Sequence, residues 1–188
     1  RQSEKYSTVY TDYKAIGFQA ATLFRQKGYT EAAVFTARRP YMATGLRTQA
    51  FLNACTQIGI TVDPEEIFAT ANSISGGVEA ARAYCAASQP SKVIFCESDL
   101  MALGAIWELN HQGIRMPQDV ELLCIGMMDP EMTEYSSPSL STIQMNNKEV
   151  TEKALDLLLD AIADGSRDPR QIEVPFQVYL RSTFQSRS

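Results

Sequence analysis

The stretch that decides the fold runs from Val93 to Gly126 and reads VIFCESDLMALGAIWELNHQGIRMPQDVELLCIG. An apolar run, 93–96, ends at a polar corner, a helical pattern continues to Gln112, and a second apolar run covers 122–125. Two short β-prone runs joined by a helix long enough for a parallel crossover predict one βαβ unit.

The rest of the chain repeats this alternation. Further strands are expected at 6–10, 32–36, 67–70 and 140–144, and the segment 172–181 is expected to be a strand pair or one bent strand around Pro175. Helices are expected at 15–28, 44–58, 73–87 and 147–165. The last of these helices carries its apolar residues at helical spacing, which predicts an inward face of Val150, Ala154, Leu157, Leu158, Ala161 and Ile162. The alternation predicts an α/β fold with a mostly parallel sheet.

Composition limits the function classes. Hydrophobic residues make up 45% and charged residues 21% of the 188 residues, as in ordinary globular proteins. The formal net charge of −5 argues against nucleic-acid binding by this segment, since phosphate contacts need a basic surface. No apolar run is long enough to span a membrane, and residues 1–8 do not read as a signal peptide. The four cysteines show no C-x-x-C pairing, which indicates buried free thiols in a reducing compartment and hence a cytoplasmic protein.

Polar residues gather at the predicted carboxyl ends of the strands, where parallel sheets bind ligands. They are Asp12, the loop 36–41, Ala71-Asn72-Ser73, Glu97-Ser98-Asp99 and Met127-Met128-Asp129. Helix capping is an alternative role for the Ser98-Asp99 pair, and a turn is one for Asp129. Arg47, one turn into its helix, opposes the helix dipole, so it either reaches a ligand or is solvated.

Signals for catalysis are weak. His111 keeps no motif spacing with a nucleophile, and Gly76-Gly77 lacks the surroundings of a phosphate-binding loop. We therefore expect no enzyme activity, no cofactor and no metal.

The decisive stretch resembles the effector-binding domain of the LacI/GalR family of bacterial transcription regulators. That family shows a small polar pair with Asp, then [LM]-A-x-G, then G-x-x-x-P-x-D-V and an apolar strand; SDLMALG and GIRMPQDVELLCIG keep this order and spacing. The likeness continues at YSSPSLSTIQ (135–144), at LRST (180–183), at Gly28-Tyr29, and at Arg47 and Phe51, where Ala50 replaces a usual glycine.

The resemblance implies a periplasmic-binding-protein-like type I fold, in which helices cover both faces of each sheet and two lobes enclose a cleft. Residues 1–12 would end the first lobe, 13–139 would form the second lobe, 140–165 would return to the first lobe, and 166–188 would supply the final strands of the second. The chain would therefore hold one complete lobe and part of another. The helix-turn-helix domain would be absent from this chain.

The resemblance also implies effector contacts at Arg47, Asp99 and Ser98, with Asn72 in a ligand-contacting loop and Asp12 at the lobe crossing. At 126–129 the family has Gly-aromatic-Asp-[DN], and here Met128 replaces the first aspartate while Asp129 keeps the second. Met128 would form an apolar wall. Sugar hydroxyls left unpaired at that wall would cost about 1–3 kcal/mol each, which argues against an ordinary sugar.

The function expected from this resemblance is small-molecule sensing by a repressor. A sugar, sugar derivative or nucleoside-like effector would close the lobes of a homodimer and alter its affinity for operator DNA, which the helix-turn-helix would bind. We expect no membrane partner. The alternative is a solute-binding protein of a transport system, which shares the fold; an upstream helix-turn-helix or signal peptide would distinguish the two.

Overall fold

The computed structural model describes residues 6–38, 42–164 and 168–185, without the side chains of 42–44 and 164. The chain divides into two compact units. Unit 1 consists of Arg1–Asp12 and Met145–Gln177, and unit 2 of Tyr13–Gln144 and Val178–Ser188.

Unit 2 is built around a six-stranded sheet with the order β3-β2-β4-β5-β6-β8. Its strands are β2 (Ala33–Ala37), β3 (Ile67–Thr70), β4 (Val93–Cys96), β5 (Glu121–Gly126), β6 (Ser141–Gln144) and β8 (Gln177–Tyr179). The pairs from β3 through to β6 are all parallel. The predicted α/β fold with a mostly parallel sheet is therefore confirmed.

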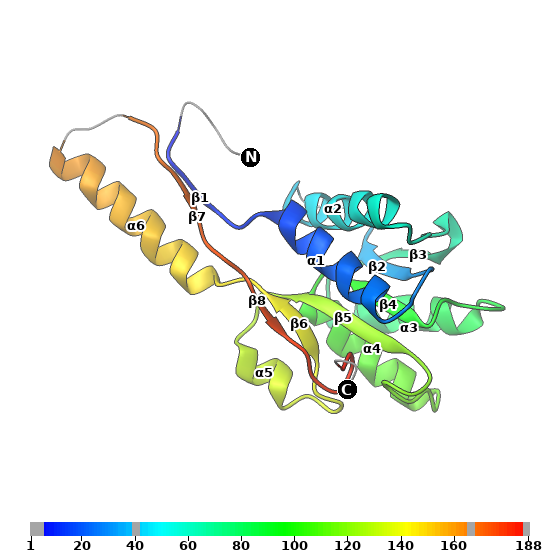
Figure 1. Ribbon diagram of the computed structural model, residues 1–188. Coiled ribbons are helices and arrows are strands. Elements are labelled where there is room, and N and C mark those ends of the chain that lie inside the picture. The colour runs from blue at the N-terminus through cyan, green and yellow to red at the C-terminus, as the bar shows by residue number, and fades with distance from the viewer. Residues whose placement is uncertain (1–5, 39–41, 165–167, 186–188) are drawn as a thin grey trace. The chain divides into compact units, whose positions relative to one another are not determined.

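Helices cover both faces of this sheet (Figure 1). α1 (Tyr13–Gln26) packs on α2 (Met42–Ile58), and α3 (Ile74–Ala86) packs on α4 (Asp99–His111). A 3-10 helix (Pro64–Glu66) precedes β3, and the short helix α5 (Pro130–Glu134) follows β5. Every residue of β4 and β5 is buried, which explains the apolar runs 93–96 and 122–125.

The decisive stretch forms the predicted βαβ unit. β4, α4 and β5 follow one another, and the two strands pair in parallel from Val93 opposite Glu121 to Cys96 opposite Cys124. Phe95 of β4 stacks on Phe51 of α2 with ring centroids 4.0 Å apart. The apolar side chains of the central strands thus form the middle of the core.

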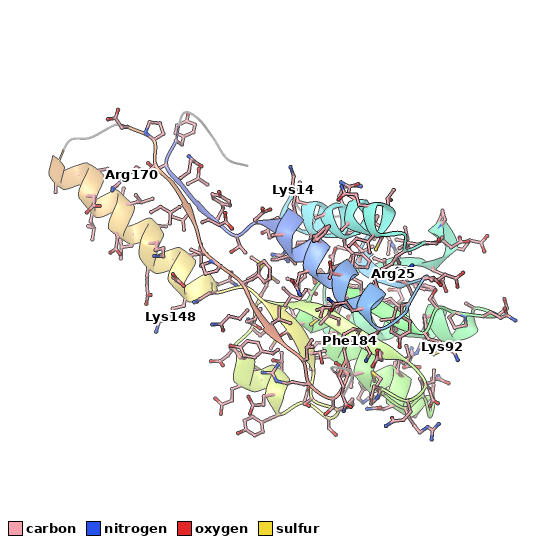
Figure 2. All side chains as sticks on the ribbon, in the orientation of Figure 1. Lys14, Arg25, Lys92, Lys148, Arg170 and Phe184 are labelled. Carbon is pink, nitrogen blue, oxygen red and sulfur yellow. The ribbon has the colours of Figure 1, made fainter. Side chains whose placement is uncertain are left out.

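The end of the chain also contributes to the core of unit 2. Phe184, labelled in Figure 2, is 1% exposed, and its ring lies 5.5 Å from that of Phe24 in α1. Nearby, Lys27 pairs with Glu121 at the amino end of β5, and Lys27 Nζ lies 4.6 Å from the Phe184 ring centroid. Lys27 Nζ also donates a hydrogen bond to Gln185 O at 2.7 Å, so Lys27, directly after α1, joins the last residues to the start of β5.

Unit 1 is small. It contains β1 (Thr8–Tyr10), β7 (Gln171–Glu173), which pairs with β1 in parallel, and α6 (Asn147–Asp164). The inward face predicted for α6 is wrong at most positions: Leu157 is buried and Val150 half-buried, but the other four residues are exposed, with Leu158 at 58% and Ile162 at 71%. Helical periodicity shows which residues share a face, but it does not show what covers that face.

The division into units differs from the ranges expected for the lobes. Residues 140–144 were expected to return to the first lobe, but β6 pairs with β5 in unit 2. Residues 166–177 were expected among the final strands of the second lobe, but they fall in unit 1, where β7 pairs with β1. The segment 172–181 was expected to be a strand pair or one bent strand. The structure has two strands there, β7 and β8, which belong to different sheets and so do not pair with each other.

The aspartate of the G-x-x-x-P-x-D-V pattern, Asp119, has a structural role between α4 and β5, because it forms hydrogen bonds with Arg115. The carboxylate of Asp119 accepts hydrogen bonds from the backbone N, Nε and Nη2 of Arg115 at 2.9, 2.8 and 2.8 Å. These bonds lower the pKa of Asp119 from 3.8 to about 2. The hydrogen bonds between Arg115 and Asp119 close the turn that leads into β5.

The lowered pKa gives a pH-dependent prediction. Because the folded-state pKa lies below the unfolded value, the contribution of Asp119 to stability is present above pH 3.8 and is lost as the pH falls through about 2. We expect Asp119→Asn to be less stable than wild type at pH 6 and the difference to shrink toward pH 2. Urea unfolding across this range measures it, and a difference independent of pH would contradict the assignment.

Candidate functional site

The candidate site lies at the carboxyl edge of the sheet, at the corner that follows β4. Three consecutive residues there, Glu97, Ser98 and Asp99, are each fully buried, and each bonds to a different neighbouring segment. The strand order reverses beside them, because β2 leads outward to β3 and the chain then returns across β2 to β4. Open α/β sheets bind ligands at such a switch point.

Asp99 holds the loop between β5 and α5. Its Oδ2 accepts hydrogen bonds from the backbone N–H groups of Met127 and Met128, both at 2.6 Å, and its Oδ1 accepts one from Leu100 N at 2.9 Å. Short bonds between a carboxylate and backbone amides are strong. The carboxylate predicted to contact the effector is therefore already engaged by three backbone amides, and it shapes the site through the loop it holds.

Ser98 joins the corner to the loop before α3. It caps α4, accepting a hydrogen bond from Met101 N at 3.4 Å, and it donates one to Asn72 Oδ1 at 2.6 Å. Ser73, next to Asn72, caps α3 through a bond from Gly76 N at 3.1 Å. The capping role considered for Ser98 is present, and the bond to Asn72 brings two predicted site residues together.

Glu97 was expected at the polar edge of the sheet but not among the effector contacts. Its Oε2 accepts hydrogen bonds from the hydroxyls of Thr36 in β2 at 2.7 Å and Thr48 in α2 at 2.8 Å, and its Oε1 accepts one from Ala37 N at 2.9 Å. The signal available in the sequence was a charged residue directly after a buried strand. No family motif marked that position.

Arg47 is a predicted site residue with buried polar atoms that lack a hydrogen-bond partner in the described residues. It is 5% exposed, and its guanidinium carbon lies 5.3 Å from the centroid of the Tyr13 ring. Within the described residues, Nε and Nη1 have no hydrogen-bond partner. Buried charged donors without acceptors are costly, and they indicate a place where a ligand supplies the acceptors.

The two residues after Met127 have structural contacts of their own. The carbonyl oxygen of half-buried Met128 accepts a hydrogen bond from Gln144 Nε2 at 2.9 Å. Asp129 is exposed and caps α5, because its Oδ1 accepts a bond from Glu131 N at 3.0 Å. Asp129 therefore fulfils the turn role that was its alternative.

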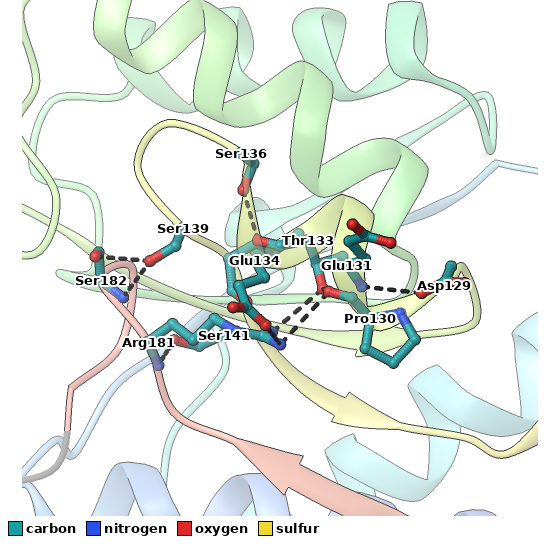
Figure 3. Close-up of polar contacts among 11 residues, drawn as sticks. Asp129, Pro130, Glu131, Thr133, Glu134, Ser136, Ser139, Ser141, Arg181 and Ser182 are labelled. Atoms are coloured by element: carbon teal, nitrogen blue, oxygen red, sulfur yellow. Dashed lines mark hydrogen bonds and ion pairs between the residues drawn. The ribbon is translucent and has the colours of Figure 1, made fainter.

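Arg181 holds α5 from the other side (Figure 3). Its Nη1 donates to Thr133 Oγ1 at 3.2 Å and to Leu140 O at 2.9 Å, and its Nη2 lies 3.7 Å from a carboxylate oxygen of Glu134. Its backbone N donates to Ser141 Oγ at 2.8 Å. The helix after the Met127–Asp129 loop is thus fixed at its start by Asp129 and along its length by Arg181.

Comparison with known proteins agrees with this geometry. Residues 21–184 match the family model described as a periplasmic binding protein-like domain. A crystal structure of a LacI family transcription regulator from Clostridium acetobutylicum superposes with a TM-score of 0.91 at 34% identity, covering 96% of this chain and 67% of that one. The chain belongs to the LacI family.

Curated relatives of this LacI-family domain are repressors. The HTH-type transcriptional repressor CytR of Escherichia coli (strain K12) is 29% identical over 85% of this chain and 48% of its own length. The HTH-type transcriptional repressor PurR of Vibrio cholerae serotype O1 (strain M66-2) is 30% identical over 89% of this chain and 49% of its own length. The chain thus spans about half the length of the curated relatives it matches, and the resemblance found in the sequence is confirmed.

The LacI-family domain places six of the seven predicted site residues in unit 2. Hydrogen bonds connect Asn72 to Ser98 and Asp99 to Met128, and Arg47 is next to Thr48, which bonds to Glu97. Asp12 is the last residue of the first segment of unit 1.

Among the thiols, that of Cys96 contacts this network, because its Sγ donates a hydrogen bond to Ser98 O at 3.2 Å. All four cysteines are free, with Cys55, Cys96 and Cys124 buried, and burial raises the pKa of Cys55 to about 12. His111 stacks on Trp107 with ring centroids 5.5 Å apart. Among the described residues, no group of three or more potential ligands could hold a metal ion, and no helix has the length and hydropathy needed to cross a membrane.

Proposed function

We propose that this chain is the effector-sensing domain of a LacI-type transcriptional repressor and that it binds a small molecule at the carboxyl edge of the sheet in unit 2. The observation that carries the proposal is Arg47, which is 5% exposed and has two buried donors without partners in the described residues. An effector with hydrogen-bond acceptors would satisfy those donors through charge-assisted bonds.

The neighbouring residues suggest how the effector is held. Asn72 would add an amide contact, and Ser98 keeps that amide in place. Asp99 would act through the loop it fixes, Met128 would supply an apolar wall, and Asp129 and Asp12 would stand at the rim. This is a binding mechanism in which no bond is made or broken, so the domain is not an enzyme.

The regulatory step would be a change in the geometry of two lobes that biases DNA affinity, since a ligand shifts an equilibrium by its preference for one state. Operator DNA would be bound by a helix-turn-helix like those of the curated relatives, in the cytoplasm. A homodimer is supported by exposed apolar side chains on α4, on α5 and directly after α5, where Trp107, Met132 and Tyr135 are 57%, 57% and 77% exposed.

The other function considered, solute binding for a transport system, has less support. The three relatives named above are all transcription regulators. A transport role would require the full reading frame to encode a signal peptide instead of a helix-turn-helix.

The proposal is tested on the full-length protein. A thermal-shift screen of sugars, sugar derivatives, nucleosides and small acids would identify an effector, and calorimetry would measure its Kd. We expect Arg47→Ala to weaken binding at least about tenfold, since it removes two charge-assisted bonds. Arg25→Ala, which removes the same charge at an exposed position in the last turn of α1, serves as the control and should leave Kd unchanged.

Two results would contradict the proposal. If the Kd of Arg47→Ala stays within about twofold of the wild-type value, Arg47 does not contribute to effector binding. A full-length protein whose affinity for its operator does not change when the effector is added would remove the regulatory role.

A further inference from the structure

We propose that Glu97 is a positioning residue: its buried carboxylate, clamped between Thr36 and Thr48, sets the rotation of α2 and thereby the direction of the Arg47 guanidinium. The inference rests on the proposed function only in taking Arg47 as the effector contact. It assigns a role to a charge that the binding mechanism has not used.

The surroundings of Glu97 are unusual for a carboxylate. The residue is fully buried, yet no described Lys, Arg or His lies within ion-pair distance of it. A buried charge without a counter-ion is tolerated only if hydrogen bonds replace its lost hydration. Two threonine hydroxyls and the Ala37 amide supply those bonds at 2.7–2.9 Å.

These bonds connect three elements at the switch point of the sheet. Glu97 directly follows β4, Thr36 and Ala37 end β2, and Thr48 belongs to α2. The two hydroxyls are also 2.8 Å from each other, so the three oxygens form a compact triangle. The charge-assisted bonds to Glu97 are sensitive to small movements, because hydrogen-bond strength falls steeply with distortion.

The hydrogen bonds to Glu97 affect the position of Arg47 because Thr48 and Arg47 belong to the same helix. Arg47 and Thr48 are consecutive in α2, so a rotation of the helix moves both side chains together. On its other side α2 touches α1: a Cβ added at Gly17 would lie 2.5 Å from the carbonyl carbon of Ala50. This backbone contact and the hydrogen bond to Glu97 fix the rotation of α2. The side chain of Arg47 is thereby directed over the Tyr13 ring.

The same unit offers a matched control. Glu121 is 4% exposed and also accepts hydrogen bonds, from Lys27 Nζ and from Tyr29 Oη at 3.0 Å. It opens β5, so it lies at the amino end of the strands, opposite to the corner at Glu97. Truncation of Glu121 removes a buried carboxylate from the same sheet without touching α2.

The experiment observes Arg47 directly and needs no effector. In the full-length protein labelled with ¹⁵N at arginine, the Nε–H signal of Arg47 is identified by its loss in Arg47→Lys, and its exchange with water is measured. We expect Glu97→Ala to raise that exchange rate at least tenfold and Thr48→Val to raise it by a smaller factor. Glu97→Gln should restore most of the protection, because its amide oxygen can still accept from Ala37 N while its NH₂ donates to the threonine oxygens.

Glu121→Ala should lower stability and leave the Arg47 signal unchanged. The proposal is overturned if Glu97→Ala and Thr48→Val leave the exchange rate within twofold of wild type, or if Glu121→Ala raises it as much as Glu97→Ala does. Should Glu97→Ala fail to fold, Thr48→Val decides, since it removes one hydroxyl and keeps the side-chain volume. Because no ligand takes part, failure here is distinct from failure of the effector-sensing proposal, which appears only in the binding and operator measurements.

Discussion

Replacing Gly104 by alanine is expected to lower the free energy of unfolding by about 2–3 kcal/mol. The sign is the informative part, because alanine in the middle of a helix is normally more stable than glycine by about 1 kcal/mol. A Cβ at Gly104 would lie 1.9 Å from the carbonyl oxygen of Ile74 in α3. A backbone atom cannot rotate out of the way, so α3 and α4 would have to separate.

The same contact exists in the reverse direction, because a Cβ at Gly77 of α3 would lie 1.9 Å from the carbonyl oxygen of Met101 in α4. The two helices therefore touch backbone to backbone at one glycine from each. Urea unfolding of the 188-residue chain measures the effect, with Asn110→Ala, at an exposed position on the same helix, as the control that should stay within about 0.5 kcal/mol. A Gly104→Ala variant as stable as wild type would show that the helices can part without cost.

These glycines illustrate what a sequence can and cannot indicate. Gly104 belongs to the [LM]-A-x-G pattern, so its position was noticed through the family resemblance while its physical reason was not. Gly76-Gly77 could be excluded as a phosphate-binding loop from its surroundings alone. That Gly77 meets α4 depends on the packing of two helices whose crossing point no local pattern specifies.

The strands were the most predictable part of the fold. Ile67–Thr70 and Val93–Cys96 have the predicted bounds, because short apolar runs between turn signals mark buried strands. Partners of strands were less predictable: β6 and β7 pair in different units from those expected, since hydrogen bonding between segments far apart in sequence leaves no local trace. The exposure of the apolar face of α6 was unpredictable for the same reason, because the local sequence does not show which segment covers a helix face.

The sequence predicted where the site lies but did not predict all of the residues that form it. The rule that ligands gather at the carboxyl ends of parallel strands located the corner after β4. Transfer of family contacts selected Ser98 and Asp99 and passed over Glu97, whose partners Thr36 and Thr48 are 61 and 49 residues away in the chain. Only the folded structure shows that three adjacent side chains each fasten a different segment.

The second large effect is expected at Asp99. Truncation by Asp99→Ala should lower the free energy of unfolding by at least about 3 kcal/mol, because the backbone amides of Leu100, Met127 and Met128 would lose their shared acceptor in a buried site. Asp99→Asn should fall between alanine and wild type, since its single amide oxygen replaces only one of the two carboxylate oxygens.

Asp129→Ala is the matched control for this prediction. Both aspartates precede or open a helix and both were predicted as effector contacts, but Asp129 is exposed and caps only the five-residue helix α5, so its loss should cost about 1 kcal/mol. Urea unfolding gives the two costs, and hydrogen exchange at the Met127 and Met128 amides reports the loop itself. Equal costs for the two variants, or unchanged protection of those amides in Asp99→Ala, would show that the loop is held by something other than Asp99. If the costs differ as expected, the aspartate carried over as a ligand contact is first of all the residue that builds one wall of the site, and a weaker effector affinity in Asp99→Ala must be corrected for the loss of that wall before any direct contact is inferred.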